Sequence, residues 1–126
     1  MSRKRLLVVD DERDMLDCVA EVLGPHFHLT LAQSGAEALR RLREQPFDAV
    51  VLDLKMESTE GADGFDVLHY LSKEQPQTRV LIASGLPRLD NIAQRYGALD
   101  WLAKPYHIDV LEQRVARLMG DEPGPL

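Results

Sequence analysis

Residues 49–52, Ala-Val-Val-Leu, form an unbroken apolar run that ends at Asp53. A run this short, without alternating polar residues, is typical of a strand buried on both faces in the middle of a parallel sheet. Such a sheet needs helices on both faces, so this run constrains the chain to an α/β fold. Asp53 would then lie at the carboxyl end of its strand, where open α/β sheets place their ligands.

Three further apolar runs also end in polar residues. They are Leu6–Val9 before Asp10 and Asp11, Val80–Ala83 before Ser84, and Trp101–Ala103 before Lys104 and Pro105. A fifth strand is expected at residues 27–31, where apolar and polar residues alternate. Because parallel strands bring their carboxyl ends to one edge, we expect three carboxylates, a hydroxyl and an ammonium to converge there.

Segments with helical spacing separate these strands. Helices are expected over residues 12–23, from Ser34 to about 44 behind a Ser34–Glu37 capping box, from Gly64 to before Pro76, over 89–96 ahead of Gly97, and over 108–119. Strict alternation with right-handed crossovers predicts a doubly wound, five-stranded parallel sheet in a three-layer α/β/α domain. Residues 1–119 would form this domain, and residues 120–126, with two prolines and two glycines, a flexible tail or the start of a linker.

Charge and cysteine content narrow the function classes. The net charge of -6 argues against nucleic-acid binding by this domain, because no basic excess is present to neutralise phosphates. The single Cys18 cannot form an internal disulfide and is read as a small apolar helix residue. The basic residues 3–5 are followed by only four apolar residues, too few for a signal peptide or a membrane span. A cytoplasmic protein without membrane contact is expected.

The residues at the strand ends suit phosphoryl chemistry. The carboxylates of Asp10, Asp11 and Asp53 suit Mg²⁺, a hard cation that takes oxygen ligands and retains several waters. Asp53 is then the candidate nucleophile, which would attack phosphorus to form an acyl phosphate. Lys104 would pair with the phosphoryl oxygens, and the Ser84 hydroxyl would hydrogen-bond to one of them.

As a set, these residues resemble the receiver domain of two-component response regulators, including those of the chemotaxis type. The resemblance rests on Asp10-Asp11, on Asp53 followed by Leu54 and Met56, on Gly64–Leu68, on Ser84, and on Gly97-Ala98 ahead of residues 101–105. It implies a flavodoxin-like sheet of strand order 2-1-3-4-5. It also implies a phosphorelay in which Asp53 receives the phosphoryl group from a histidine kinase or a histidine phosphotransfer protein. Such a domain is a switch and not an enzyme, apart from its own phosphoryl transfer and dephosphorylation.

The same resemblance assigns roles to individual residues. Asp11, Asp53 and the backbone carbonyl of Lys55 would bind Mg²⁺, with Asp10 acting through water. Ser84 and Trp101 would form the switch, and the Lys104–Pro105 peptide would be cis. The output partner, or a second copy in a homodimer, would bind the face made by the fourth helix, fifth strand and fifth helix.

Three features depart from the family pattern. Glu57 stands where the family usually has proline, and about three extra residues precede Gly64, which suits the start of the third helix better than Gly61 does. Trp101 replaces the usual Tyr or Phe, so plain packing is the alternative interpretation of that residue. A solvated side chain is the alternative for Lys55.

Three other functions compete with the phosphorylated switch. A degenerate receiver would bind partners without phosphorylation, but the complete set of site residues disfavours it. An aspartate-nucleophile phosphatase of the haloacid dehalogenase type needs an Asp-x-Asp pair, whereas Asp10 and Asp11 are adjacent. A flavin-binding module needs a phosphate-cradling loop, which the sequence lacks.

Overall fold

The computed structural model describes residues 3–56 and 61–120. Strands and helices alternate along the chain, as the sequence predicts. They are β1 Arg5–Val9, α1 Arg13–Leu23, β2 His28–Ala32, α2 Gly35–Glu44, β3 Ala49–Leu52, α3 Gly64–Glu74, β4 Arg79–Ser84, α4 Leu89–Tyr96, β5 Asp100–Ala103 and α5 Ile108–Leu118. The third helix begins at Gly64, which confirms the position expected from the sequence.

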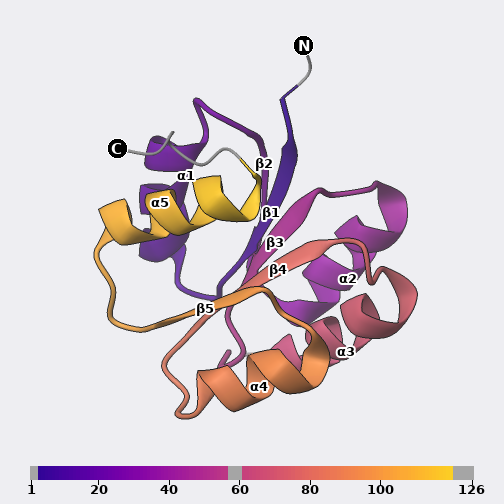
Figure 1. Cartoon of the computed structure of the whole chain (residues 1–126). Coiled ribbons are helices and arrows are strands. Elements are labelled where there is room, and N and C mark those ends of the chain that lie inside the picture. The colour runs from indigo at the N-terminus through magenta and orange to yellow at the C-terminus, as the bar shows by residue number, and fades with distance from the viewer. Residues whose placement is uncertain (1–2, 57–60, 121–126) are drawn as a thin grey trace.

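The five strands form one parallel sheet in the order β2-β1-β3-β4-β5. Helices α1 and α5 cover one face of this sheet, and α2, α3 and α4 cover the other (Figure 1). The doubly wound, three-layer architecture is therefore confirmed. Because α1 and α5 lie on the opposite face from the other three helices, the central strands are enclosed on both sides.

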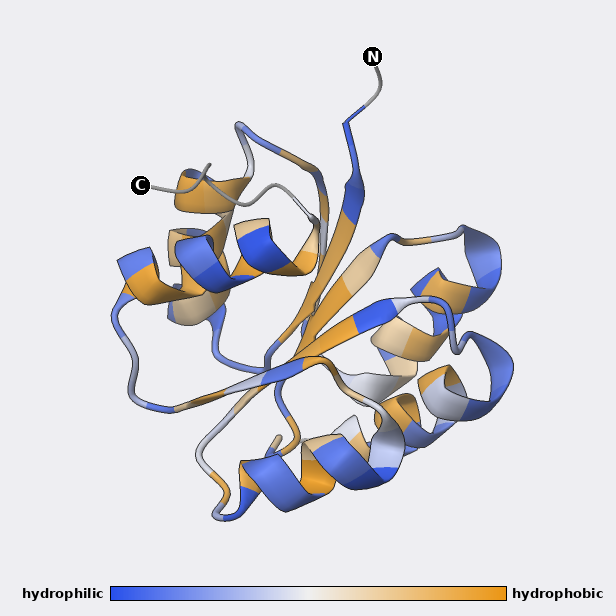
Figure 2. Cartoon of the chain, viewed as in Figure 1, coloured by the Kyte–Doolittle hydropathy of each residue, from blue (hydrophilic) through white to orange (hydrophobic). Residues whose placement is uncertain are grey.

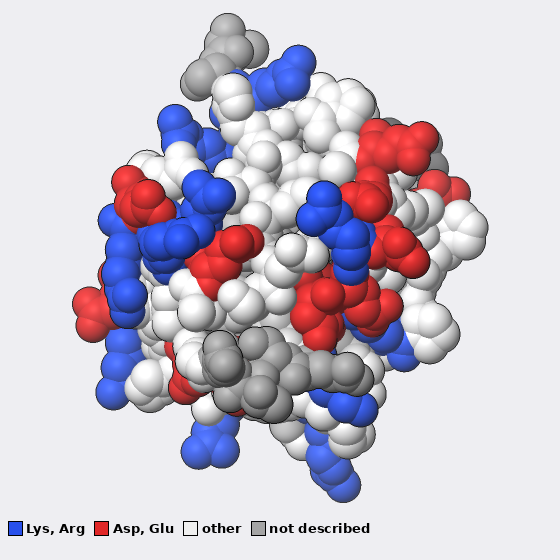
Figure 3. Space-filling view, turned by 180° about the vertical axis from the view of Figure 1, so that it is seen from behind, with Lys and Arg blue, Asp and Glu red and all other residues white. Residues whose placement is uncertain are grey.

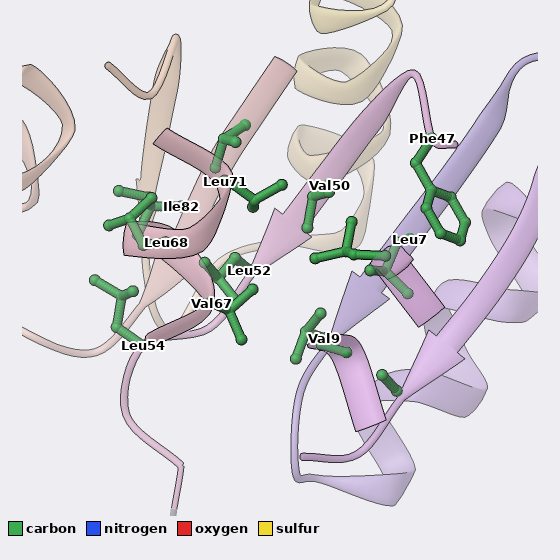
Figure 4. Packing of buried hydrophobic residues seen from close by; sticks show 14 of the residues in the cluster. Leu7, Val9, Phe47, Val50, Leu52, Leu54, Val67, Leu68, Leu71 and Ile82 are labelled. Atoms are coloured by element: carbon green, nitrogen blue, oxygen red, sulfur yellow. The ribbon is translucent and has the colours of Figure 1, made fainter. Parts of the chain in front are cut away.

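Alternate residues of the central strands belong to two separate cores. In β1, Leu6 and Val8 pack toward α1 and α5, whereas Leu7 and Val9 pack toward α2 and α3. The second of these cores is drawn in Figure 4. Figure 2 shows the apolar strands in the middle and helices whose polar residues lie outside. Burying each such Leu or Val contributes about 1.5–3 kcal/mol, so the central strands contribute strongly to stability.

The capping residues expected from the sequence can be compared with the observed ends of α2 and α4. The Ser34 hydroxyl accepts the Glu37 N–H (3.1 Å), but the Glu37 carboxylate accepts the N–H of Gln33 rather than that of Ser34. The expected capping box is thus completed one residue early. Gly97 ends α4 with a left-handed φ of 78°, as its role of helix stop predicts.

A complete capping box is present at α3, where the sequence analysis did not identify one. The Asp63 carboxylate accepts the Asp66 N–H, and the Asp66 carboxylate accepts the Asp63 N–H, each at 2.9 Å. This pair fixes the end of the loop that begins at Asp53. Of that loop, Glu57 and Glu60 lie outside the described residues, as does the expected tail beyond Gly120.

Among residues 3–56 and 61–120, no helix is both long and apolar enough to cross a membrane.

The two-core packing predicts unequal effects of the same substitution at two leucines. Leu7 is fully buried, whereas Leu99 is 63% exposed. We expect Leu7→Ala to lower the free energy of unfolding by about 3 kcal/mol, because it leaves a cavity in the centre of the sheet. Leu99→Ala should change it by less than about 0.5 kcal/mol. Urea denaturation of both variants measures the difference, and equal effects would contradict the packing.

Candidate functional site

Four predicted site residues are brought together at the carboxyl edge of the sheet: Asp10, Asp11, Asp53 and Lys104. Backbone hydrogen bonds extend the strand pairing past the strand ends: Asp53 N–H donates to the Val9 carbonyl (3.0 Å), and Lys104 N–H donates to that of Ser84 (2.9 Å). Asp10 follows β1 directly, so these bonds place it beside Asp53. The side chains of Asp10 and Asp53 are almost completely buried although both are ionisable. The predicted convergence of carboxylates with an ammonium is therefore present.

The Lys104 ammonium lies between the two buried carboxylates. Its Nζ donates to Asp10 Oδ2 (2.7 Å) and to Asp53 Oδ2 (2.9 Å), and the Glu12 carboxylate lies 3.5 Å away. The other oxygen of each aspartate accepts a backbone N–H from two residues further along, Glu12 for Asp10 and Lys55 for Asp53, both at 3.0 Å. Each carboxylate is thus held in a fixed orientation by one cation and one N–H group.

Burial dominates the electrostatics of the nucleophile candidate. Burial raises the pKa of the Asp53 carboxyl above its usual value, because the charged form loses hydration; Lys104 opposes this shift without cancelling it, and Asp10 adds to it. For Lys104, burial by itself would lower the pKa, but the hydrogen bonds to Asp10 and Asp53 outweigh it, so its pKa is raised. Lys104 therefore stays charged throughout the physiological pH range.

The carboxylates are arranged to accept a cation. Asp10, Asp11 and Asp53 each offer an oxygen, and these oxygens lie within 4.8 Å of one another. The site opens into a cavity of about 380 Å³, which Asp11 and Asp53 line. An all-oxygen donor set beside a solvent-accessible cavity fits Mg²⁺, which keeps several of its waters. Lys55 lines the same cavity, where its N–H contacts Asp53; the role of its carbonyl stays a prediction.

The remaining predicted residues lie around this centre. Ser84 is fully buried at the end of β4, and its Oγ accepts the Leu86 N–H (3.4 Å). The Lys104–Pro105 peptide bond is cis. Trp101 lies on β5 with 43% of its surface exposed, so in this conformation it is not buried in either core. It does not belong to the acidic centre, which consists of Asp10, Asp11, Asp53 and Lys104.

Three residues near the site were not singled out by the sequence analysis. Glu12 and Gly85 line the cavity, and their only sequence signal is that they directly follow Asp11 and Ser84. Tyr106 donates its hydroxyl to Met15 Sδ (3.4 Å), and burial raises the pKa of this phenol to about 12. Its partner lies 91 positions away in the sequence, so no local pattern could have found this contact.

Charge is unevenly distributed over the surface. Seen from behind, acidic side chains are more frequent on one side of the molecule and basic side chains on the other, although each side carries both (Figure 3). Helix α1 carries the exposed acids Asp14, Asp17 and Glu21, whereas α2 carries three arginines. Of these arginines, Arg40 lies within 4.0 Å of both Glu37 and Glu44, so the basic side is partly neutralised.

A parallel sheet of order 2-1-3-4-5, with three carboxylates and a lysine at its carboxyl edge, defines a signal-receiving domain of the response-regulator class. Comparison with known proteins gives the family itself: the model for the response regulator receiver domain matches residues 6–116. The chain belongs to that family, as its sequence motifs indicated.

Relatives and solved structures agree with this assignment. A Rickettsia bellii (strain RML369-C) protein described as NtrX-like is 34% identical over 114 residues, covering 88% of this chain and 24% of that protein. The receiver domain of NtrX from Brucella abortus is 30% identical, with a TM-score of 0.80 over 91% of this chain and 98% of that one. The BeF3-activated receiver domain of DrrB from Thermotoga maritima is 25% identical, with a TM-score of 0.80 over 95% and 99% of the two chains.

The curated relatives are longer than this chain. It spans about a quarter of the length of those it matches, from 24% to 26%. The likeness therefore concerns their receiver domains.

The position of Lys104 predicts a pH-dependent loss of stability when its charge is removed. In Lys104→Met the Asp10 and Asp53 carboxylates lose their shared cation, and we expect the free energy of unfolding at pH 7 to fall by about 3 kcal/mol. The folded-state pKa of Asp53 is already raised and would rise further, so protonation favours the folded variant as the pH falls. The difference in the free energy of unfolding between wild type and Lys104→Met should therefore become smaller as the pH falls from 7 to 4.5.

Urea denaturation of wild type and variant at both pH values measures this change. Lys55→Met is the matched control, because the Lys55 side chain is exposed and the bond to Asp53 comes from the Lys55 backbone N–H, which the substitution keeps. A deficit that is constant with pH, or equal for the two lysines, would contradict the electrostatic role of Lys104.

Proposed function

We propose that Asp53 accepts a phosphoryl group, with the help of Mg²⁺, from the phosphohistidine of a histidine kinase or a histidine phosphotransfer protein. The observation that carries this proposal is the setting of the Asp53 carboxylate. It is buried and oriented, it lies beside Asp10, Asp11 and Lys104, and it borders a cavity that solvent can enter. A buried carboxylate with a raised pKa, next to further acids in a cleft, is typical of a functional site.

The transfer uses residues that are already in position. A carboxylate oxygen of Asp53 attacks phosphorus, the P–N bond to the imidazole breaks, and the imidazole nitrogen leaves with the bonding electrons. The product is an acyl phosphate on Asp53. Lys104, now bonded to the Asp53 carboxylate at 2.9 Å, is within reach of the phosphoryl oxygens and would stabilise their charge.

The acidic centre supplies the cation site that this reaction needs. Asp10, Asp11 and Asp53, with the carbonyl of Lys55, would hold Mg²⁺, which when bound neutralises the carboxylates and polarises a phosphoryl oxygen. Without a cation, three neighbouring carboxylates repel an incoming phosphoryl dianion. The protein's own Lys104 offsets only part of this repulsion.

The phosphoryl group would change the conformation through Ser84 and Trp101. The acyl phosphate carries a charge of about -1.5 to -2, where the Asp53 carboxylate carried -1, and it brings several acceptor oxygens beside Lys104. If the buried Ser84 hydroxyl turns toward these oxygens, it leaves its contact with Leu86, and the exposed ring of Trp101 on the neighbouring strand can rotate inward. This rotation would reshape the face of α4, β5 and α5, where we place the output partner or a second copy of the chain. The relative DrrB has been obtained in a BeF3-activated form.

The first test of the proposal is phosphorylation of Asp53. Incubation with acetyl phosphate and Mg²⁺ should add one phosphoryl group, detected by intact mass, and chelation of Mg²⁺ should prevent it. Asp53→Asn should abolish labelling, because an amide cannot form an acyl phosphate. Asp48→Asn, at the other end of the same segment, should label normally. Full labelling of Asp53→Asn would contradict the assignment of Asp53 as the phosphoryl acceptor. An unlabelled wild type would favour a receiver that works without phosphorylation.

The second test follows the conformational change. Trp101 is the only tryptophan, so its emission reports on β5 without interference. With Mg²⁺, beryllium fluoride as a phosphoryl mimic should change the emission of wild type. The change should be absent in Asp53→Asn and at least about twofold smaller in Ser84→Ala, which loses roughly 1 kcal/mol of hydrogen bonding. Unaltered emission despite stoichiometric binding would make Trp101 a packing residue.

A further inference from the structure

Helix α2 contributes no side chain to the acidic centre, yet its first residue lies against the loop that follows Asp53. Gly35 is buried, and a Cβ built on it would lie 2.2 Å from the Ala62 carbonyl oxygen and 2.8 Å from that of Asp63. Both distances are shorter than any contact that a real Cβ makes. The backbone of the loop is therefore seated directly on the amino end of α2, at a distance that only glycine permits.

A second close approach joins the same loop to the nucleophile. A Cβ on Gly64, the first residue of α3, would lie 2.4 Å from the Asp53 carbonyl oxygen and 2.5 Å from the Cα of Leu54. Gly64 directly follows Asp63, which the reciprocal hydrogen bonds with Asp66 tie to α3. Residues 62–64 therefore contact α2 on one side and the backbone of Asp53 on the other.

Glycine is not required at every turn around the site. A Cβ on Gly85, which lines the same cavity, would meet no atom within 4 Å. Next to Asp53, the close contacts are thus those of a stack that runs from Gly35 through residues 62–63 and Gly64 to Asp53, whereas Gly85 has none.

We propose that Gly35 is a positioning residue for phosphoryl transfer: the amino end of α2 sets the position of the Asp53 backbone through this stack. This inference rests on the proposed function. A side chain at position 35 would force the carbonyl of Ala62 to move by about 1 Å, because α2 itself is anchored by Ala38 and Leu42 in the core. The displacement would pass to Asp53, whose carboxylate is oriented by Lys55 and Lys104. Misplacement on this scale costs up to about 100-fold in rate.

The test compares Gly35→Ala with Ser34→Ala. Ser34→Ala is the matched control, because it removes the cap that accepts the Glu37 N–H, at the same helix end, without adding any atom near the loop. The first readout is the NMR shift of the Lys55 amide, which donates to Asp53 Oδ1 and reports its position without any phosphorylation. The second is the rate of labelling by acetyl phosphate with Mg²⁺.

We expect Gly35→Ala to shift the Lys55 amide and to slow labelling at least ~10-fold, whereas Ser34→Ala leaves the amide in place and the rate within about twofold. A folded Gly35→Ala with a wild-type rate overturns the proposal, whether or not the amide shifts. If wild type is not labelled at all, the proposed function fails, and the Lys55 amide alone decides whether Gly35 positions Asp53.

If Gly35→Ala does not fold, the same contacts are tested in wild type, because a close-packed stack that carries a displacement from Gly35 to Asp53 also carries one from Asp53 to Gly35. Mg²⁺ with beryllium fluoride should then shift the amides of Gly35 and Ala36 and leave that of Gly24, at the far end of α1, unchanged. No shift at Gly35 in the saturated protein overturns the proposal.

Discussion

The fold depends on one constraint: the central strands β1, β3 and β4 are parallel and buried on both faces. Their residues alternate between two cores, so helices must cover each side of the sheet, and the chain must cross over after every strand. The same parallel arrangement sends every strand end to one edge. Asp10, Asp53 and Ser84 become neighbours there because each follows or ends a strand that the two cores hold in register.

The carboxyl edge of the sheet is electrostatically costly, because it buries two carboxylates. Asp10 and Asp53 lose hydration on burial, and Lys104 compensates through two short hydrogen bonds that raise its own pKa. The pKa of Asp53 nevertheless remains raised. In the proposed function, a cation or a phosphoryl group would alter this balance and change the partners of Lys104, which would provide a physical route from chemistry at Asp53 to conformation elsewhere in the domain.

The elements were predictable to within about one residue, and the small differences have physical causes. The strand at residues 49–52 and the helix start at Gly64 were correct because their patterns are unambiguous. The second strand was expected at residues 27–31 but runs from His28 to Ala32. It is an edge strand whose bounds are set by pairing with β1, which joins Arg5 to His28, and not by its own alternation of polar and apolar residues. Phe27 is buried beside it without being part of it.

The sequence by itself determined the fold class, the order of elements, the family and the residues that gather at the sheet edge. Each of these is indicated by a local pattern in a short segment: an apolar run, a helix stop or a side chain at the end of a strand. Only the tertiary structure decided that Lys104 bonds to both Asp10 and Asp53, that Trp101 is exposed, and that Gly35 lies against Ala62. The two contacts join residues that are far apart in the chain, and the exposure of Trp101 depends on what packs around it. All three depend on how helices and strands pack, which no local pattern specifies.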